Sequence, residues 1–499
     1  MKTSLTLEFL KMAKVLLTHS YFLRFDPKQW KQQQPYPPLG TIYAAAVLKE
    51  AGYSTALHDS MFAMSAGEIL PVIEKEKPEY LVIYDDGFNY LTKMCLTNMR
   101  EAAFRMSEIA KRNGCKVIVS SSDSTDHPKE YMEHGADYII MGEGETTLLE
   151  LLNGLENDRS IDSIPGLAYK KKNKIIFNSK REVLKNLDSL PMPAWDLINI
   201  KPYKEVWINK WGYFSMNIAT TRGCPFKCNW CAKPIYGNRY NSRSPENVAT
   251  ELNYLKLHFS PDHIWFCDDI FGLKPGWVKK FADIVEEQKL NLKFKIQCRA
   301  DLLLQDDYVA DLARAGCESV WMGAESGSQK ILDAMDKGTK VPQIYEATRL
   351  LKKYKIHSAF FLQFGYPGET LDDISLTIKM LLELVPDDIG ISVSYPLPGT
   401  VFYGKVKEQL NLKSNWTDSD ELALMFRNTY PTQFYKHLHR FVHKIYRGKQ
   451  AINSLKKMIA NPVSITVKDL KKALSILYYS PASQLYKWRM KKNEKFHVT

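Results

Sequence analysis

The chain has 499 residues, too many for one ordinary domain, so two or three domains are expected. Its 45% hydrophobic and 25% charged residues are typical of a soluble globular protein, and no apolar run approaches the roughly 18 residues that span a bilayer. Eight cysteines exclude a disulfide scaffold in a chain of this length, and a start interrupted by Glu8 and Lys11 makes a poor signal peptide. We therefore expect a protein of the reduced cytoplasm.

The net charge of +12 is concentrated at one end of the chain. Residues 436–499 contain 15 Lys and Arg against 2 Asp and Glu, whereas the remainder has 53 against 54. The basic character therefore belongs to a C-terminal region. No nucleic-acid recognition motif accompanies it, so we expect no nucleic-acid partner.

Residues 1–155 alternate short apolar runs with helical patterns. Five runs are predicted to be buried strands. They are Lys14–His19, Ser54–His58, Glu79–Tyr84, Cys115–Ser120 and Asp137–Met141. Helices are predicted between them, among them Thr41–Ala51 and about Thr92–Asn113. This alternation predicts a parallel sheet wrapped by helices, the doubly wound α/β class.

Ligands of such sheets bind at the carboxyl ends of the strands. Small, hydroxyl-bearing and acidic residues follow the predicted strands and leave room for a bulky ligand. They are His19, Ser20, Tyr84, Asp85, Ser120, Ser121, Ser122, Gly142 and Glu143. An alternative role for Glu143 and Glu145 is to stabilise the N-terminus of the next helix, a contribution of about 0.3–1 kcal/mol.

Residues 156–212 are predicted to be a linker. Leu167–Phe177 has the pattern of a small hairpin that turns at Lys172–Asn173. Leu187–Trp195 is punctuated by prolines and is expected to be extended. We assign no chemistry to this segment.

Three cysteines, Cys224, Cys228 and Cys231, follow a predicted strand at Phe214–Ala219 with the spacing C-x3-C-x2-C. Thiolates hold iron–sulfur clusters, and a cubane needs four ligands, so three cysteines leave one iron open to another molecule. The neighbours Arg222 and Lys227 favour an electropositive loop that stabilises thiolates.

Two alternatives compete with a cluster at this loop. Zinc usually takes four protein ligands, and the next candidate, His258, is distant and has no partner at ligand spacing. A disulfide would leave one cysteine over. The other cysteines lie in or beside apolar segments and are expected to be small core residues. They are Cys95, Cys115, Cys267, Cys298 and Cys317.

Residues 213–400 resume the β-α alternation. After the strand at Phe214–Ala219, five more strands are predicted. They are His263–Cys267, Lys293–Cys298, Ser319–Met322, Ser358–Gln363 and Gly390–Ser394. Their carboxyl ends lead into Asp268–Asp269, Arg299, the run Gly323–Gly327 that contains Glu325, and Gly365–Glu369. A helix cap or a solvated turn is the alternative interpretation of Asp268 and Asp269.

Residues 401–499 are predicted to be a helical, basic region. His437, His439 and His443 lie in a basic helix, and we expect them at the surface. Val467–Tyr479 is amphipathic. Two interpretations stay open for it: a helix on an anionic membrane surface, at the inner face of the cytoplasmic membrane, or a domain-capping helix with a solvated lysine face.

The cysteine loop and the strand-end motifs together resemble the radical S-adenosylmethionine (SAM) superfamily. The resemblance implies a six-stranded partial (β/α)6 barrel, a [4Fe–4S] cluster on Cys224, Cys228 and Cys231, and SAM on the fourth iron. It also implies an external electron donor such as flavodoxin or ferredoxin. Carried over motif by motif, it implies SAM contacts from Phe226, Trp230, Asp268, Asp269, Arg299, Glu325, Gly365 and Pro367.

Pro37–Gly40 and Gly142–Glu145 ahead of this barrel resemble the cobalamin-binding domain of B12-dependent radical SAM enzymes. The D-x-H-x-x-G motif, by which some B12 proteins bind cobalt through histidine, is missing. The resemblance covers roughly residues 14–430 and extends to the group with the anaerobic magnesium-protoporphyrin ester cyclase and the hopanoid methylases. It implies cobalamin contacts from Ser20, Tyr84, Asp85, Ser120, Ser121, Ser122, Gly142 and Glu143.

The implied reaction is methylation of an unactivated carbon of a small-molecule or lipid-like intermediate, through a 5′-deoxyadenosyl radical and methylcobalamin. Three alternatives stay open. The same cofactors could drive a cyclisation, rearrangement or oxidation without net methyl transfer. A methylthiotransferase usually needs a second cluster, for which the remaining cysteines show no ligand pattern. A non-catalytic binding protein is disfavoured by the three intact cysteines.

Overall fold

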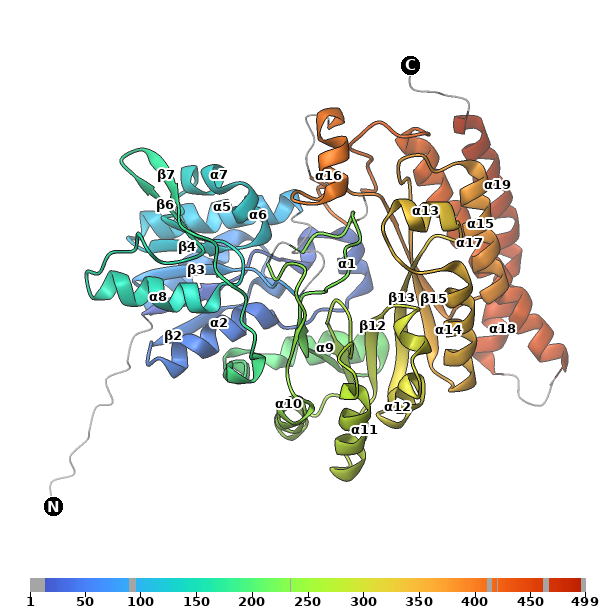
Figure 1. The fold of residues 1–499 in the computed structure, drawn as a ribbon, viewed down its shortest axis with the longest axis horizontal. Helices are drawn as coiled ribbons and strands as arrows, with labels where there is room; N and C mark the ends of the chain where they lie inside the picture. Colours follow the sequence, from blue (N-terminus) through green and yellow to red (C-terminus); the bar gives the residue numbers. More distant parts are fainter. Residues whose placement is uncertain are drawn as a thin grey trace. The chain divides into compact units, whose positions relative to one another are not determined.

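The computed structural model describes residues 14–88, 96–233, 235–410, 415–419, 421–460 and 466–494 (Figure 1). These residues form two compact units. The first unit is built from Met1–Cys224, Lys233–His263 and Thr417–Asp420, as far as the structure describes them. The second is built from Pro225–Ala232, Ile264–Trp416 and Glu421–Thr499. The chain therefore leaves the first unit at the cysteine loop, returns to it, and leaves it again.

The first unit contains a seven-stranded sheet of order β2-β1-β3-β4-β5-β6-β7. Its strands are β1 (Val15–Thr18), β2 (Thr55–His58), β3 (Tyr80–Tyr84), β4 (Lys116–Ser120), β5 (Tyr138–Ile140), β6 (Leu167–Lys171) and β7 (Lys174–Phe177). The first five are parallel, as predicted, and have the flavodoxin-like order 2-1-3-4-5. Their register brings all five carboxyl ends to one edge of the sheet.

The hairpin expected within the linker forms and extends this sheet. β6 pairs with β5 and β7 in antiparallel fashion. Lys172 and Asn173 form the two-residue turn, and both have positive φ (46° and 62°), as a primed turn requires. The segment from 167 to 177 is therefore part of the first sheet and not a free connection.

Helices cover both faces of this sheet (Figure 1). The helices of the first unit are α1 (Pro27–Gln32), α2 (Leu39–Glu50), α3 (Ile69–Glu76), α5 (Thr97–Arg112), α6 (Ser122–Asp126), α7 (Pro128–Glu133), α8 (Glu145–Glu156), α9 (Ile200–Trp211) and α10 (Pro245–His258). α3, α5 and α7 bury apolar side chains against one face, while α2 and α8 contact each other beside the other face. The start predicted for α5, about Thr92, lies outside the described residues.

Helix α9 has no counterpart in the sequence prediction. Its buried side is made by bulky aromatic residues that also donate hydrogen bonds: Trp207 Nε1 donates to the Pro35 carbonyl at 2.8 Å, and the Tyr203 hydroxyl donates to Asp59 at 2.7 Å. Asn199 caps the N-terminus, and Gly212 ends the helix with φ of 78°. The helix is thus held by a few aromatic anchors, which an apolar periodicity does not reveal.

The second sheet has the order β15-β14-β13-β12-β11-β8. Its strands are β8 (Ser215–Ile218), β11 (His263–Phe266), β12 (Phe294–Cys298), β13 (Cys317–Glu325), β14 (His357–Phe364) and β15 (Asp388–Val393). All six were predicted, and β11 to β15 pair in parallel. β13 is longer than expected, because a bulge between Gly323 and Glu325 lets the strand continue through the Gly-Ala-Glu motif. A small antiparallel pair, β9 (Thr221–Arg222) and β10 (Asn241–Ser242), flanks the cysteine loop in the sequence.

Helices of the second unit alternate with its strands and continue into the C-terminal region. They are α11 (Trp277–Glu287), α12 (Tyr308–Arg314), α13 (Gln329–Ala334), α14 (Val341–Lys353), α15 (Leu371–Leu384), α16 (Val401–Val406), α17 (Thr432–Ala460), α18 (Val467–Leu474) and α19 (Ile476–Glu494). α17 packs against α15 and β15, and α19 lies along α17 (Figure 1). Tyr446 donates to the Pro386 carbonyl at 2.6 Å, and Arg447 pairs with Asp388 at 2.9 Å. These contacts tie the basic region to the edge strand of the barrel sheet.

Two expectations about single residues have opposite outcomes. The prediction that His437 lies at the surface is wrong: its side chain, on α17, is buried, and burial lowers its pKa. Cys115, Cys267, Cys298 and Cys317 are buried, as predicted for core residues. Cys95 lies outside the described residues.

No helix in the described part of the chain is long and apolar enough to cross a membrane.

Candidate active site

The three motif cysteines lie in the irregular segment that follows β9. Each is partly exposed, and the backbone N–H of Cys231 donates to the Cys228 carbonyl at 3.2 Å, which forms a turn. Cys224 belongs to the first unit, and Cys228 and Cys231 belong to the second. Among the described residues, no three His, Cys, Asp or Glu side chains converge as a preformed metal site. The loop therefore has one end in each unit.

At the first-unit end, Arg222 is a fully buried cation held by two carboxylates. Its Nη1 lies 2.5 Å from Glu143 Oε1, and its Nη2 lies 2.7 Å from Glu145 Oε1. All three side chains are no more than 6% exposed. A buried cation needs this compensation, because taking an ion out of water costs several kcal/mol.

Aromatic rings complete the surroundings of Arg222. The guanidinium carbon lies 5.4 Å from the ring centroid of Tyr43, 5.8 Å from Phe88 and 5.3 Å from Tyr236. These are cation–π distances. We call Arg222 together with Glu143, Glu145 and these three rings the Arg222 cage. The cage holds Arg222, which lies two positions before Cys224, the first motif cysteine, in a fixed place.

The Arg222 cage changes the roles predicted for two residues. Glu143 is predicted to contact cobalamin, but in the structure one of its oxygens accepts from Arg222 and the other from the Leu184 backbone N–H. Glu145 begins α8, as the capping alternative requires, and also holds Arg222. Burial raises the pKa of Glu143, and the charge of Arg222 opposes that rise. Because Arg222 is neutralised in this way, its charge is not directed at the thiols.

Gly223 separates Arg222 from Cys224 and cannot be replaced without distortion. Its φ is 79°, and a Cβ atom at this position would lie 2.4 Å from the carbonyl oxygen of Arg239. That separation is far below van der Waals contact. The close approach of the two backbone segments therefore requires glycine.

At the second-unit end, Asn229 holds the loop from within the C-x2-C turn. Its backbone N–H donates to the Met335 carbonyl at 3.0 Å, and its carbonyl accepts from the Phe402 N–H at 2.9 Å. Its side-chain Nδ2 donates to the Ala334 carbonyl and to Asp336, both at 2.8 Å, and its Oδ1 accepts from the Tyr366 hydroxyl at 2.8 Å. Sequence reasoning missed Asn229. The available signal in the sequence was an asparagine between Cys228 and Cys231, two of the predicted ligands.

Arg299 supplies the cation beside a motif thiol. It follows β12, and its Nη1 lies 3.9 Å from Cys228 Sγ. The guanidinium stacks on Phe226, 3.7 Å from the ring centroid. Asp301 accepts from two of its nitrogens at 2.9 Å, which fixes its orientation. The electropositive surroundings predicted for the thiols are thus supplied by Arg299.

Glu325 ends β13 in a conformation that L-residues rarely adopt, with φ of 55°. Its carboxylate accepts from Lys337 Nζ at 2.8 Å, and both side chains are buried. Burial acts to lower the pKa of Lys337, but the charges of Glu325 and Cys228 outweigh it and raise that pKa. A Cβ atom at Gly323 would lie 2.6 Å from Lys337 Nζ, so a larger residue here would displace the Lys337 side chain. Strain held by surrounding structure in this way is a mark of functional sites.

The indole N–H of Trp230 is buried and has no hydrogen-bond partner among the described residues. Lys337 Nζ lies 6.0 Å from this ring. A buried donor without an acceptor costs about 1–3 kcal/mol, so a further acceptor is expected at this point. Within the second unit, the thiols of Cys228 and Cys231, a cation at one thiol sulfur and an unmatched donor are a set of groups that fits part of an anionic sulfur cluster with a bound polar cofactor.

Four predicted SAM contacts remain: Asp268 and Asp269 after β11, and Gly365 and Pro367 after β14. Asp268 is buried and Asp269 is exposed, so the two adjacent carboxylates divide between interior and solvent. Gly365 (φ 76°) donates its N–H to Glu369 at 2.6 Å, and Pro367 is partly exposed in the same turn. All eight predicted SAM contacts, these four included, stay predictions.

Glu369 is a buried carboxyl whose second oxygen has no partner among the described residues. Burial raises its pKa to about 8, although the Gly365 N–H opposes the rise. In the unfolded chain this carboxyl ionises near pH 4.5, whereas in the fold it stays neutral up to about pH 8. The neutral carboxyl therefore contributes its full stabilisation below about pH 4.5, and this contribution is lost as the pH rises to about 8.

We expect Glu369→Gln to remove this pH dependence. As the pH rises from 5 to 8.5, the wild type should lose this contribution and the variant should not. The difference in unfolding free energy should therefore shift in favour of the variant by on the order of 3–5 kcal/mol. Urea unfolding at a series of pH values measures the difference. Glu346→Gln, at an exposed site, is the matched control and should follow the wild type. Parallel curves for the wild type and Glu369→Gln would contradict a neutral buried Glu369.

At the carboxyl edge of the first sheet, the predicted cobalamin contacts other than Gly142 are buried, and Ser20 is bonded to Asp85. The Ser20 N–H and hydroxyl donate to Asp85 at 2.7 and 2.9 Å. Tyr84 and Ser120 are paired across β3 and β4, and a Cβ atom on Gly144 would lie within 2.9 Å of both side chains. Ser121 caps α6, where Ser122 is the first residue, and Gly142 has a φ of 78°. The structure brings these residues to one edge; their contact with cobalamin stays a prediction.

A histidine–carboxylate pair at the same edge was not predicted. His19 Nε2 lies 2.9 Å from Asp59 Oδ1, and the Tyr203 hydroxyl donates to the other oxygen of Asp59 at 2.7 Å. Burial acts to raise the pKa of Asp59, but its bonds to His19 and Tyr203 lower it. The pair joins the ends of β1 and β2 to the aromatic side of α9.

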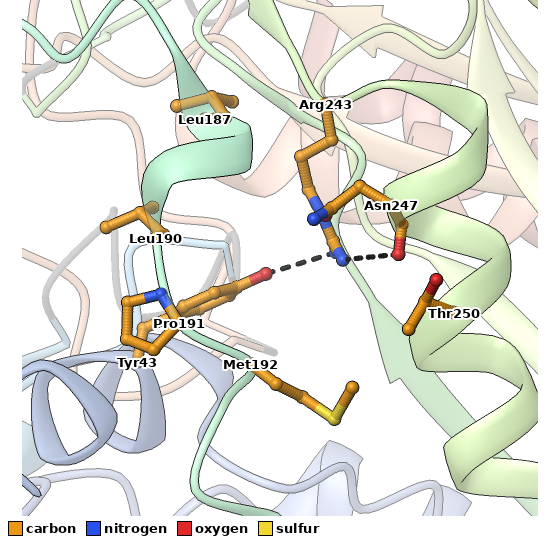
Figure 2. Close-up of a pocket in the computed structure, with 8 residues that line it drawn as sticks. All are labelled: Tyr43, Leu187, Leu190, Pro191, Met192, Arg243, Asn247 and Thr250. Atoms are coloured by element: carbon orange, nitrogen blue, oxygen red, sulfur yellow. Dashed lines mark hydrogen bonds between the residues drawn. The ribbon is translucent and has the colours of Figure 1, made fainter. Parts of the chain in front are cut away.

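A small cavity in the first unit lies beneath Arg243 (Figure 2). Arg243 lies between Tyr43 and Asn247, at 3.2 Å from the Tyr43 hydroxyl and 2.6 Å from Asn247 Oδ1. The proline-punctuated segment that contains Pro191 and Met192 forms one wall. The volume of about 40 Å³ is enough for water alone. This cavity is therefore a structural void.

Residues 218–381, which include the three cysteines and most of the second sheet, match the family model of the radical SAM superfamily. With the cysteine spacing and the six-stranded open sheet, this match defines the class: the chain is a radical SAM enzyme, a class whose domain implies a [4Fe–4S] cluster and SAM.

Among its relatives are proteins with two kinds of named activity. The chain is 28% identical over 389 residues to a protein of Pyrococcus horikoshii named as an uncharacterised methyltransferase, covering 76% of this chain and 81% of the relative. It is 25% identical over 394 residues to the anaerobic magnesium-protoporphyrin IX monomethyl ester cyclase of a Synechocystis species, covering 78% and 76%.

The solved structure of OxsB, a cobalamin-dependent SAM radical enzyme with aqua-cobalamin bound, has a similar fold. The TM-score is 0.70 at 18% sequence identity, covering 96% of this chain and 72% of OxsB. At this identity the likeness concerns the fold. The α/β class predicted from the sequence, with a doubly wound domain, an open barrel and a helical C-terminal region, is confirmed.

Proposed function

We propose that this protein is a cobalamin-dependent radical SAM methylase that acts on an unactivated carbon of a small-molecule or lipid-like intermediate. The observation that carries the proposal is the presence of two sites in one chain. A parallel sheet of order 2-1-3-4-5 presents a carboxyl edge of serines and glycines, and a C-x3-C-x2-C loop accompanies a second open sheet. A relative named as a methyltransferase supports methyl transfer over other radical outcomes.

The residues at each site suit the proposed groups. Cys224, Cys228 and Cys231 would hold the cluster, and Trp230 and Glu325 lie in the part of the barrel where SAM would bind. When bound, the cluster and SAM supply a 5′-deoxyadenosyl radical, and cobalamin supplies a methyl group. At the edge of the first sheet, Asp85 is already satisfied by Ser20, so small hydroxyls and glycines remain for a neutral, amide-rich ligand.

The protein's own contribution is to position these groups and to exclude water. Arg299 places its guanidinium 3.9 Å from the Cys228 sulfur, where its positive charge would face an anionic cluster. Lys337 neutralises Glu325 in the interior, so that the strained strand end is held in one conformation. Asn229 and Tyr366 fix the C-x2-C turn against the ends of α13 and β14.

Anaerobic purification with added cobalamin, followed by iron and cobalt analysis, tests the cofactor assignment. About four irons and one cobalt per chain are expected. Incubation with SAM, a reductant and candidate lipid or tetrapyrrole intermediates, followed by mass spectrometry, tests the reaction. A product heavier by one methylene indicates methylation.

Two outcomes would contradict the proposal in different ways. Four irons without cobalt would leave a radical SAM enzyme in which the first sheet is only a scaffold. A product that loses hydrogen or forms a ring without gaining a methylene would favour oxidative cyclisation, the activity named for the Synechocystis relative.

A further inference from the structure

The described C-terminal helices carry an unusual share of the exposed apolar surface. Ten of the nineteen exposed large apolar side chains in the described residues lie between Ile452 and Trp488. Scattered exposed apolar residues are normal, but a concentration of this kind marks an interaction surface. All ten lie within the second unit, on α17, α18 and α19.

On α18 and the start of α19 these residues form one stripe. Val467, Leu470, Leu474 and Leu477 are separated by three, four and three positions, which places them on the same side of a helix. Their exposed fractions are 70%, 47%, 57% and 75%. Ala473, which is 6% exposed, is the one buried side chain described on α18. We call these four residues the Leu470 stripe.

The Leu470 stripe decides between the two interpretations of the basic segment. α18 does pack on α17, and Lys444 of α17 donates to the Tyr478 hydroxyl at 2.9 Å. A capping helix is expected to turn its lysines alone to solvent. Here Lys471 and Lys472 are exposed, Lys471 at the border of the stripe, but the aliphatic stripe is exposed as well.

The charge around the stripe identifies its partner. Residues 436–499 contain 15 basic and only 2 acidic side chains. A second copy of the chain would place an equally basic region against this one, and like charges repel. An anionic phospholipid surface attracts the lysines and accepts the aliphatic side chains below its headgroups. Trp488, 60% exposed, is a residue type that favours this depth.

We infer that α18 and the start of α19 attach the protein peripherally to an anionic membrane surface through the Leu470 stripe. The lysine stems lie along the apolar boundary and keep their ammonium groups at the phosphates. The attachment is independent of the proposed reaction, since it rests on none of the cluster, SAM or cobalamin residues.

Vesicle flotation of the full chain tests this inference. The wild type should float with vesicles of phosphatidylcholine mixed with phosphatidylglycerol and remain at the bottom with phosphatidylcholine alone. Leu470→Gln/Leu474→Gln should weaken the partition coefficient about tenfold or more, because two exposed apolar side chains lose their contact with the bilayer. Lys471→Gln/Lys472→Gln should weaken binding at about 0.1 M salt and much less at high salt.

Leu257→Gln is the matched control, because Leu257 is a leucine 79% exposed on α10. It should float like the wild type, and melting curves should show that all variants fold. Failure of the wild type to float would overturn the inference. So would equal flotation of wild type and Leu470→Gln/Leu474→Gln, or light scattering in which the stripe variant converts a dimer to a monomer.

Discussion

Cys224→Ala, Cys228→Ala and Cys231→Ala are each expected to abolish iron retention after anaerobic reconstitution. A cubane needs four ligands, so the loss of one of three thiolates should reduce iron from about four per chain to well below one. Reductive cleavage of SAM should fall by more than about 100-fold. This loss is larger than the one typically caused by changing a residue that contacts a metal ligand without binding the metal itself. Iron analysis and product counting of 5′-deoxyadenosine measure the two effects.

Cys298→Ala is the matched control for the three ligand variants. Cys298 is adjacent to Arg299, but its thiol is buried and its pKa is raised to about 12, chiefly by burial. A buried, protonated thiol is a poor metal ligand. The variant should keep its iron. Loss of iron in Cys298→Ala and retention in Cys231→Ala would show that the ligand set has been misassigned.

Arg222→Gln is expected to destabilise the first unit strongly and to impair iron retention as well. The substitution leaves Glu143 and Glu145 buried side by side without a cation, and breaking a buried ion pair in this way costs about 3–5 kcal/mol. The urea midpoint of the protein without iron measures the first effect. Iron content at low temperature, where the variant is still folded, measures the second.

Two further variants distinguish a role of Arg222 in positioning the cysteine loop from a role in folding stability. Arg100→Gln breaks the pair of Arg100 with Asp123 at 2.5–2.7 Å in the same unit. It should lower stability but leave iron retention unchanged. Adding Glu143→Gln and Glu145→Gln to Arg222→Gln should recover stability, since the buried charges are gone, without recovering iron. If stability and iron recover together, the Arg222 cage serves folding alone.

The strands were predictable because they are short, continuous apolar runs between clear turn residues. Parallel strands buried on both faces require such runs, and every one of those predicted forms. α9 was missed because Tyr203 and Trp207 anchor it singly, without the apolar repeat that identifies a helix. The extension of β13 through Glu325 was missed because a bulge and a positive φ are not encoded in periodicity.

The candidate site was predictable only as a set of residue types. The spacing of the cysteines identifies the kind of site, but the partners of Arg222 lie 77 and 79 positions away and leave no local signal. Glu143 appeared suited to a ligand because it follows a strand, whereas tertiary pairing assigned it to a buried arginine. Lys337 lies beyond the Gly-Ala-Glu motif and reaches Glu325 only after α13 has folded between them.

The contacts of Asn229 also bear on how the protein is made. Its partners Met335, Tyr366 and Phe402 are all synthesised after it, the last by more than 170 residues. At about 5–20 residues per second, Phe402, the last of these anchors, is made roughly 9–35 s after Asn229. The contacts that hold this turn therefore form only after Phe402 has been made, and the nascent thiols spend this interval without the fold that will hold them.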